Sequence, residues 1–307
     1  MTLPDDYLKY AHRKRGMDHD LYRWSNLFNR RTVNWPNDKS VALWITVALE
    51  YFPLTPNEGP FRAPGHMVTP YPDYRTYTTR DYGNRVGVFR IMKVLQSLGL
   101  KASAPMSAAL AERYPALLQA VKDHGWEIIG HGVDMNRIHH GGMDASVETN
   151  QIDDAISLLE QHTGTRPQGW FSPARSESEN TLKLLAERGI DYVCDWVNDD
   201  MPYEMTTENG PIVAMPHTME LDDRNLLVTL GQNEETYQEQ ILAAFDLLRT
   251  EGKTYGGRIL HLSLTPYVIG QPFRIHALKA VLEKIMASDD VWSATPSEIL
   301  KIWRERK

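Results

Sequence analysis

Apolar segments of strand length that end in polar residues, with helical patterns between them, constrain the fold most. The clearest is Val41–Leu49, a largely apolar run rich in β-branched and aromatic side chains, which Glu50 closes. Such a run is typical of a buried strand in a parallel sheet. Because the carboxyl ends of parallel strands meet at one edge, where α/β enzymes carry their catalytic groups, the polar ends predict one catalytic rim. The later segments end in His131, Ser172, Asp195, Thr265 and Thr295.

The intervals carry helix signals. Phe89–Leu98 places apolar side chains on one helical face, and Gly99 supplies a stop. Asp144 is expected to cap a helix that turns Val147 inward. Thr295–Glu298 combines a cap, a proline at the first helical position and a glutamate at the third, which predicts a helix start.

About seven strands alternating with helices predict an α/β fold, namely a single-domain distorted (β/α) barrel of parallel strands. A doubly wound sheet is the alternative. Residues 1–40 are expected to form an N-terminal extension that packs on the barrel through Trp24 and Trp35, and residues 41–307 the barrel itself. Tyr51–Arg85, rich in proline, tyrosine and glycine, is expected to be a long loop after the first strand, either a lid or a contact with a neighbouring subunit.

Composition and motifs narrow the class of function. The chain has 307 residues and a net charge of −7, and we find no basic stripe, so we expect neither a nucleic-acid nor a membrane partner. The single cysteine, Cys194, and an N-terminus without an apolar signal segment predict a cytoplasmic protein. Neither a GxGxxG or P-loop motif nor a GxSxG elbow is present. A nucleotide site of these types and a serine α/β-hydrolase are therefore not expected.

The residues at the predicted rim suggest acid–base chemistry and substrate binding. His131, between two glycines, could act as a general acid or base or as a metal ligand. Glu50 or, alternatively, Asp195 could activate water. The candidates for substrate binding lie in or beside strand-to-helix loops and are Trp170, Arg175, Glu177 and Gln271. Glu177 could instead favour the N-terminus of the helix that follows it, and Gln271 could cap its next helix.

Five segments together resemble the polysaccharide-deacetylase superfamily over about residues 20–305, and more closely its metal-independent allantoinases and cyclic imide hydrolases. They are Val47–Glu50, Tyr82–Gly87, Glu127–Gly132, Cys194–Tyr203 and Pro266–Pro272. The resemblance implies a distorted (β/α) barrel that hydrolyses a C–N bond in an amide, imide or ureide, often as a homo-oligomer.

Two positions depart from the pattern that the resemblance implies. Metal-dependent deacetylases carry an Asp-Asp pair on the first strand and an HxxxH motif, whereas this chain offers only Glu50, and Met135 stands four residues after His131. Thioether is a poor ligand for a hard divalent ion, so we assign no metal ligands and no firm cofactor, and zinc held by other residues stays open. A histidine is expected before Pro266, and this chain has Thr265, which cannot titrate near neutrality.

The resulting hypothesis is a hydrolase of a small cyclic amide, imide or ureide. Glu50 (or Asp195) would activate the water, His131 would protonate the leaving nitrogen or polarise the carbonyl, and Arg175 would help to hold the substrate. Two alternatives remain. One is N-deacetylation of a carbohydrate, and the other is a catalytically silent ligand-binding protein, which Thr265 favours.

Overall fold

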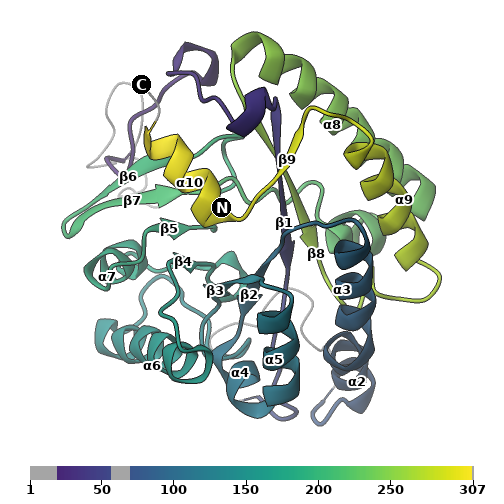
Figure 1. Cartoon of the computed structure of the whole chain (residues 1–307). Helices are drawn as coiled ribbons and strands as arrows, with labels where there is room; N and C mark the ends of the chain where they lie inside the picture. The colour runs from purple at the N-terminus through teal and green to yellow at the C-terminus, as the bar shows by residue number, and fades with distance from the viewer. Residues whose placement is uncertain (1–18, 57–69, 306–307) are drawn as a thin grey trace, which may run out of the picture.

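The computed structural model describes residues 19–56 and 70–305, in which the strands form one curled sheet (Figure 1). The strand order is β6-β7-β5-β4-β3-β2-β1-β8, and β9 pairs with the first half of β1. All pairings are parallel except the antiparallel β6–β7 pair. The strands are β1 (Val41–Val47), β2 (Ser103–Met106), β3 (Glu127–Gly130), β4 (Gly169–Trp170), β5 (Tyr192–Val193), β6 (Tyr203–Thr207), β7 (Gly210–Ala214), β8 (Arg258–Leu264) and β9 (Val291–Ser293).

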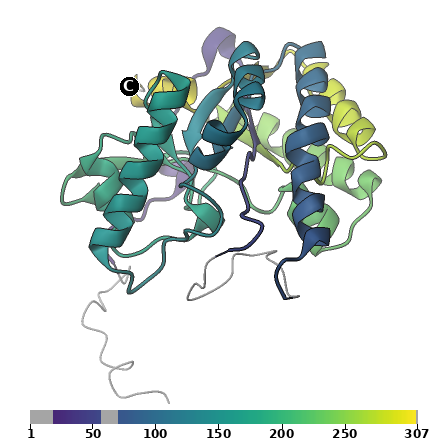
Figure 2. The same ribbon diagram turned by 90° about the horizontal axis from the view of Figure 1, so that it is seen from below.

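Helices cover the outside of this sheet, and the fold is a half-barrel in a single domain (Figures 1 and 2). The α/β barrel class expected from the sequence is confirmed. The helices are α2 (Tyr74–Tyr82), α3 (Val88–Ser97), α4 (Ala108–Arg113), α5 (Pro115–Asp123), α6 (Ala145–Thr163), α7 (Thr181–Glu187), α8 (Glu234–Tyr255), α9 (Ile275–Met286) and α10 (Pro296–Glu305), with π-helical turns η3 (Gly83–Gly87) and η5 (Asn225–Thr229).

Two expectations about helices are wrong, and one strand was not expected. The segment expected to be a loop up to Arg85 contains α2, which Asp73 caps by accepting a hydrogen bond from the Thr76 backbone N–H at 3.1 Å. Residues 57–69 of that segment lie outside the described residues. Val147 is not turned inward on α6 but is 46% exposed, because it lies in the first turn on the solvent side. Strand β6, which is polar and partly exposed, has no apolar run and was not expected.

Side-chain alternation along the strands separates the two faces of the sheet. On β1, Leu43 and Ile45 pack outward in the large core beneath the helices, whereas Trp44 packs in a second, smaller core inside the barrel. Because side chains alternate with a period of two, the inward register continues through Thr46 and Ala48 to Glu50. The first strand therefore aims Glu50 into the barrel mouth, where Glu50 lines a cavity.

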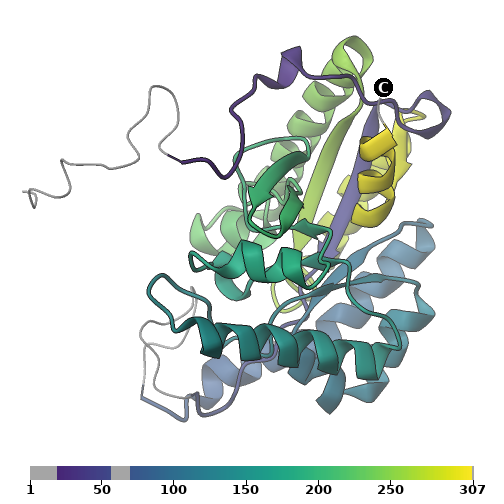
Figure 3. The same cartoon turned by 90° about the vertical axis from the view of Figure 1, so that its left-hand side faces the viewer.

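Residues 19–40 run past the β6–β7 hairpin to the start of β1 (Figure 3). Trp35 is buried, and its indole N–H donates to the carbonyl of Arg258 at 2.9 Å. Trp24 is 74% exposed, so it does not anchor the segment as expected. The proposed division at residue 40 stays a prediction. Among the helices of the described ranges, none combines the length and apolarity needed to cross a bilayer.

Candidate active site

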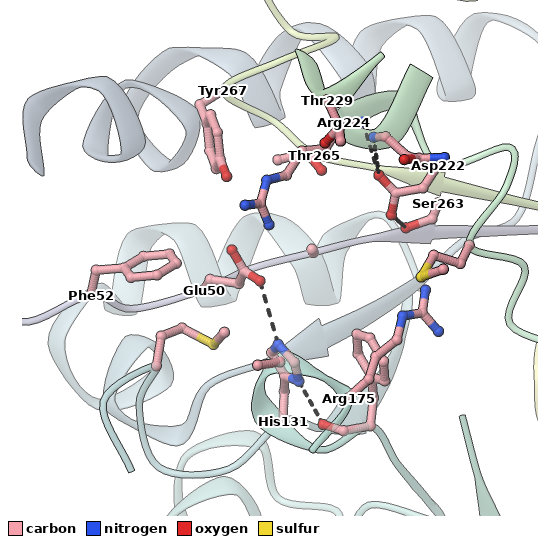
Figure 4. Close-up of a pocket in the computed structure, with 16 residues that line it drawn as sticks. Glu50, Phe52, His131, Arg175, Asp222, Arg224, Thr229, Ser263, Thr265 and Tyr267 are labelled. Atoms are coloured by element: carbon pink, nitrogen blue, oxygen red, sulfur yellow. Dashed lines mark hydrogen bonds and ion pairs between the residues drawn. The ribbon is translucent and has the colours of Figure 1, made fainter. Parts of the chain in front are cut away.

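A cavity of about 230 Å³ opens where the strands end (Figure 4). Glu50 reaches it beyond the end of β1, His131 directly after β3, and Thr265 directly after β8. Arg175 enters from the loop after β4. The structure thus brings together, from four separate strands, these four of the residues expected at the catalytic rim.

Glu50 and His131 form the centre of the site. The Nε2 atom of His131 lies 3.7 Å from the Glu50 carboxylate, and its Nδ1 atom lies 2.5 Å from the carbonyl oxygen of Phe171. Since a carbonyl only accepts hydrogen bonds, Nδ1 carries a proton, and Nε2 is left to exchange one in the cavity. Burial raises the pKa of Glu50, but His131 and two arginines, Arg224 and Arg80, more than offset it, so the pKa lies below its ordinary value and the carboxylate is charged at neutral pH.

The glycines that flank His131 make room for other parts of the protein, not for a ligand. A Cβ atom on Gly130 would lie 2.7 Å from the Trp170 ring, and one on Gly132 would lie 2.4 Å from Pro173. Gly132 also has a φ of +63°, which glycine adopts at little cost. The two glycines allow the Phe171–Arg175 loop to close on His131.

Arg175 is held by a strained loop. Ala174 and Arg175 both have positive φ values, 59° and 56°, which are unusual for residues with a Cβ atom. The guanidinium group donates to the carbonyl oxygen of His217 at 3.0 Å and lies 4.9 Å from the centre of the Phe171 ring. These contacts fix it at the edge of the cavity, where its remaining N–H groups can meet a substrate.

The other candidates from the sequence do not line the cavity. Trp170 follows the outward register of β4, is fully buried, and donates to Ser172 at 3.0 Å. Asp195 accepts the Ser172 backbone N–H at 2.8 Å and lies beside Glu177. Gln271 donates to the carbonyl of Tyr267 at 3.2 Å. The structure gives these four residues supporting contacts, and their assignment to catalysis or substrate binding gains no support from their positions.

Asp195 and Glu177 form a carboxyl pair behind the Arg175 loop. Burial, followed by the neighbouring Asp195 charge, raises the pKa of Glu177 well above its ordinary value. Burial also raises the pKa of Asp195. Glu177 is therefore the carboxyl group of the pair that keeps its proton more readily, and it accepts from the Trp196 indole N–H at 3.2 Å. Since Asp195 in turn holds Ser172, the pair supports the loop that presents Arg175.

A turn that the sequence did not suggest as a site closes the other side of the cavity. Asp222 accepts from the Ser263 hydroxyl at 2.8 Å, and Asp223 accepts the Thr265 backbone N–H at 2.9 Å. Arg224 follows them and lines the cavity. These residues come several positions after β7, so the rule that strand ends carry chemistry does not reach them.

Two buried histidines lie deeper in the barrel, below Glu50. The Thr46 hydroxyl lies 3.2 Å from Nε2 of His217 and 3.0 Å from Nε2 of His261. Phe171 stacks between His131 and His217, with ring centres 4.8 Å and 4.5 Å away. Burial lowers the pKa of both deeper rings well below the ordinary value, so both are neutral. His217 follows β7 closely, and the strand-end rule would have found it.

Comparisons with known proteins bear on the fold and the family. The profile of the polysaccharide deacetylase family matches residues 70–193. The structure of a probable polysaccharide deacetylase from Pseudomonas aeruginosa PAO1 is 27% identical, with a TM-score of 0.80 over 90% of this chain and 95% of that one. The structure of PuuE allantoinase is 26% identical, with a TM-score of 0.80 over 90% and 94%. A candidate polysaccharide deacetylase of Schizosaccharomyces pombe is 23% identical over 241 residues, which cover 73% of this chain and 74% of the relative.

Residues 70–193 thus match the polysaccharide deacetylase family, and 90% of the chain shares its fold with a probable polysaccharide deacetylase and with PuuE allantoinase. The resemblance drawn from its sequence motifs is confirmed, and the structure explains one of them. The Tyr82–Gly87 motif packs against the loop after β8: a Cβ atom on Gly87 would lie 2.0 Å from the carbonyl oxygen of Pro266. This contact positions Tyr267, which lines the cavity.

The side chains at the cavity do not fit the metal site of metal-dependent deacetylases. Beside Glu50 and His131 stand Met135 and Phe171. Across residues 19–56 and 70–305, no group of three or more histidine, cysteine, aspartate or glutamate side chains is arranged to hold a metal ion. A thioether in place of a third hard ligand is unsuited to a divalent ion such as zinc. We therefore derive no catalytic step through a metal.

Proposed function

We propose that the protein hydrolyses a non-peptide C–N bond in a small cyclic amide, imide or ureide, as an enzyme of the allantoinase or cyclic-imidase type. The observation that carries the proposal is the charged Glu50 carboxylate, 3.7 Å from Nε2 of His131 at the wall of a small cavity. A carboxylate and an imidazole that can pass one proton between them are what hydrolysis of an unactivated amide requires. The likeness to PuuE allantoinase over 90% of this chain supports the same class.

The reaction follows from these two groups. Glu50 removes a proton from water, whose oxygen forms a bond to the amide carbon, and the carbonyl electrons move to the carbonyl oxygen. The N–H groups of Arg175 face the cavity and would stabilise that negative charge. The proton on Glu50 then passes to His131 Nε2, which gives it to the departing nitrogen as the C–N bond breaks. One water is consumed, and Glu50 and His131 return to their starting states.

The size of the cavity favours a small ring. Its volume is about 230 Å³, and a protein cavity of about 150 Å³ is enough to hold benzene. A five- or six-membered ring with a few substituent atoms therefore fits. Phe52, Phe171 and Met135 contribute apolar walls that suit the faces of such a ring.

The first test is turnover by the purified protein, with and without prior chelation. The substrate panel is succinimide, hydantoin, allantoin and an N-acetylglucosamine oligomer. Turnover is measured as proton release and as ring opening. We expect opening of a ring compound that survives chelation. Glu50→Gln should lower kcat by about 10²–10⁴-fold while the circular dichroism spectrum stays unchanged. Full activity of Glu50→Gln would remove Glu50 from the mechanism.

Carbohydrate N-deacetylation is the second candidate, because the family profile and two of the relatives carry that description. It uses the same bond chemistry on an open-chain acetamide. Release of acetate from the oligomer, with none of the rings opened, would replace our proposal with this one.

A catalytically silent binding protein is the third candidate, and Thr265 is the residue that favours it. Its backbone N–H is held by Asp223 and its side chain lines the cavity. On our proposal His131 supplies the proton, so the wild type turns over without a histidine at position 265. A wild type that binds ring compounds without turnover, and gains activity in Thr265→His, would support the silent reading. Homo-oligomerisation and a cytoplasmic location also stay proposals, and light scattering of the purified protein tests the first.

A further inference from the structure

Arg224 occupies a rigid position on the wall of the cavity. Its backbone N–H donates to Asp222 at 2.8 Å, and Asp222 is in turn held by Ser263 at the end of β8. Asp223 holds the neighbouring Thr265. Two carboxylates thus tie this turn to β8, and the side chain of Arg224 starts from a fixed backbone. Figure 4 shows its guanidinium group reaching into the cavity toward Glu50, with Arg175 on a separate wall.

The guanidinium group of Arg224 acts on Glu50 through its charge and not through a direct bond. In the part of the chain that the structure describes, it takes part in no hydrogen bond or ion pair. The two other arginines near the cavity differ in this respect. Arg80 lies on the Phe52 ring at 3.7 Å, and Arg175 donates to the His217 carbonyl. A guanidinium group presents five N–H donors in a planar fork, which matches a carboxylate.

The carboxylates near Arg224 have other partners, so the guanidinium group can bind a further anion. The Glu50 carboxylate already interacts with His131 and with the charges of Arg224 and Arg80. Asp222 is occupied by Ser263 and two backbone N–H groups. No carboxylate among the described residues lies within ion-pair distance of Arg224, although its charge is close enough to lower the pKa of Glu50. A ligand carboxylate would supply the missing partner.

We propose that Arg224 is a specificity-determining residue that binds a carboxylate carried by the cyclic substrate. This inference rests on the proposed function and narrows it, from cyclic amides in general to ring amides with a carboxylate substituent. The ion pair would fix one end of the ligand, and the ring amide would then lie over Glu50 and His131. Positioning of this kind reduces the freedom that the reacting carbonyl must lose before attack.

The test is a binding measurement that does not depend on turnover. The probes are hydantoin-5-acetic acid and its neutral isostere hydantoin-5-acetamide, titrated calorimetrically into Glu50→Gln protein. We expect the acid to bind about 10- to 100-fold more tightly than the amide, since a hydrogen bond to a charged group is lost in the amide. Adding Arg224→Gln should abolish this preference and leave binding of the amide within about threefold. Arg224→Lys should restore only part of it, because lysine lacks the fork.

Arg85→Gln is the matched control, since Arg85 is 73% exposed and pairs with Asp81 outside the cavity. It should leave both affinities unchanged. Equal binding of acid and amide, binding of neither, or an equal loss of both in Arg224→Gln would overturn the inference. The two proposals fail separately. Wild type that prefers the acid through Arg224 but opens no ring would defeat the hydrolysis alone, and wild type that opens both rings with equal kcat/KM would defeat the role of Arg224 alone.

Discussion

Glu50 keeps its charge at a position where burial by itself would favour the neutral acid. The side chain is 18% exposed, and His131, Arg224 and Arg80 supply the compensating positive charge. A carboxylate in this state can accept a proton from water at neutral pH, and it becomes inactive only when it is itself protonated.

This charge state predicts the acid limb of the pH profile. Because the pKa of Glu50 lies below its ordinary value of 4.5, lowering the pH from 7 to 5 should leave Glu50 ionised. We expect no acid limb of kcat/KM with its midpoint at pH 4.5 or above that can be assigned to Glu50. Steady-state kinetics from pH 8 to 4.5, with circular dichroism at each pH, checks this. An acid limb of kcat/KM with its midpoint at pH 5–6 that is lost or shifted in Glu50→Asp would contradict the lowered pKa of Glu50.

The carboxyl pair of Glu177 and Asp195 predicts a pH dependence of stability. The pKa of Glu177 is raised on folding, so the folded protein holds a proton that the unfolded chain releases above pH 4.5. The contribution of Glu177 to the free energy of unfolding therefore falls as the pH rises from 4.5 toward the raised pKa.

Glutamine in place of Glu177 cannot release that proton. Relative to wild type, the free energy of unfolding of Glu177→Gln should rise between pH 5 and pH 8. The rise should be about 1.4 kcal/mol for each unit by which folding raises the pKa of Glu177, and urea unfolding measures it. Glu179→Gln is the control, since the pKa of exposed Glu179 is lowered and it titrates below this range. A difference between Glu177→Gln and wild type that does not change with pH would show that folding does not raise the pKa of Glu177.

At the scale of elements, the contact between η3 and the loop after β8 determines one wall of the site. A Cβ atom on Gly87 would lie 2.0 Å from the Pro266 carbonyl oxygen and 2.8 Å from its carbon, and backbone cannot rotate away as a side chain can. The loop from Pro266 carries Tyr267, so a shift there changes the cavity.

Gly87→Ala should therefore destabilise the protein by about 1–3 kcal/mol, as other overpacked substitutions do, and should raise KM. Urea unfolding and steady-state kinetics measure the two effects. Gly141→Ala is the control, because nothing lies within 4 Å of its added Cβ atom, and its unfolding free energy should change by less than about 0.5 kcal/mol. Wild-type stability of Gly87→Ala would mean that the two segments are free to separate.

At the scale of the whole molecule, the barrel interior is an apolar core that ends in a polar layer. Trp44 lies below, Thr46 with His217 and His261 above it, and Glu50 at the mouth. Burial lowers the pKa of both histidines well below 6.5, Arg175 acts in the same direction on both, and His261 does so on His217. The folded protein holds both rings neutral where the unfolded chain would protonate them.

These two rings should stay neutral in the folded protein at pH 5.5. We expect their ¹⁵N signals in histidine-labelled protein to keep the values of neutral imidazole between pH 7.5 and 5.5. Unfolding then takes up protons, so these two residues make stability fall as the pH drops below 6.5. Titration of either ring with a midpoint at 6.5 or above would contradict the burial of the pair.

The sequence by itself determined the strands except β6, most helix ends and the residues directly after the strands, because period-two runs, caps and glycine stops act over a few residues. It thereby placed Glu50, His131, Arg175 and Thr265 at one rim. It did not separate them from Trp170 and Asp195, whose register on β4 and after β5 turns them away from the cavity.

Only the tertiary structure decided the rest of the site. Arg224 lies on a turn whose position depends on two contacts across about forty residues, from Asp222 to Ser263 and from Asp223 to Thr265. His217 and His261 come together because β1 brings Thr46 between them. Such contacts join segments that are distant in the chain, and no local pattern of residues records which segments the folded sheet will bring side by side.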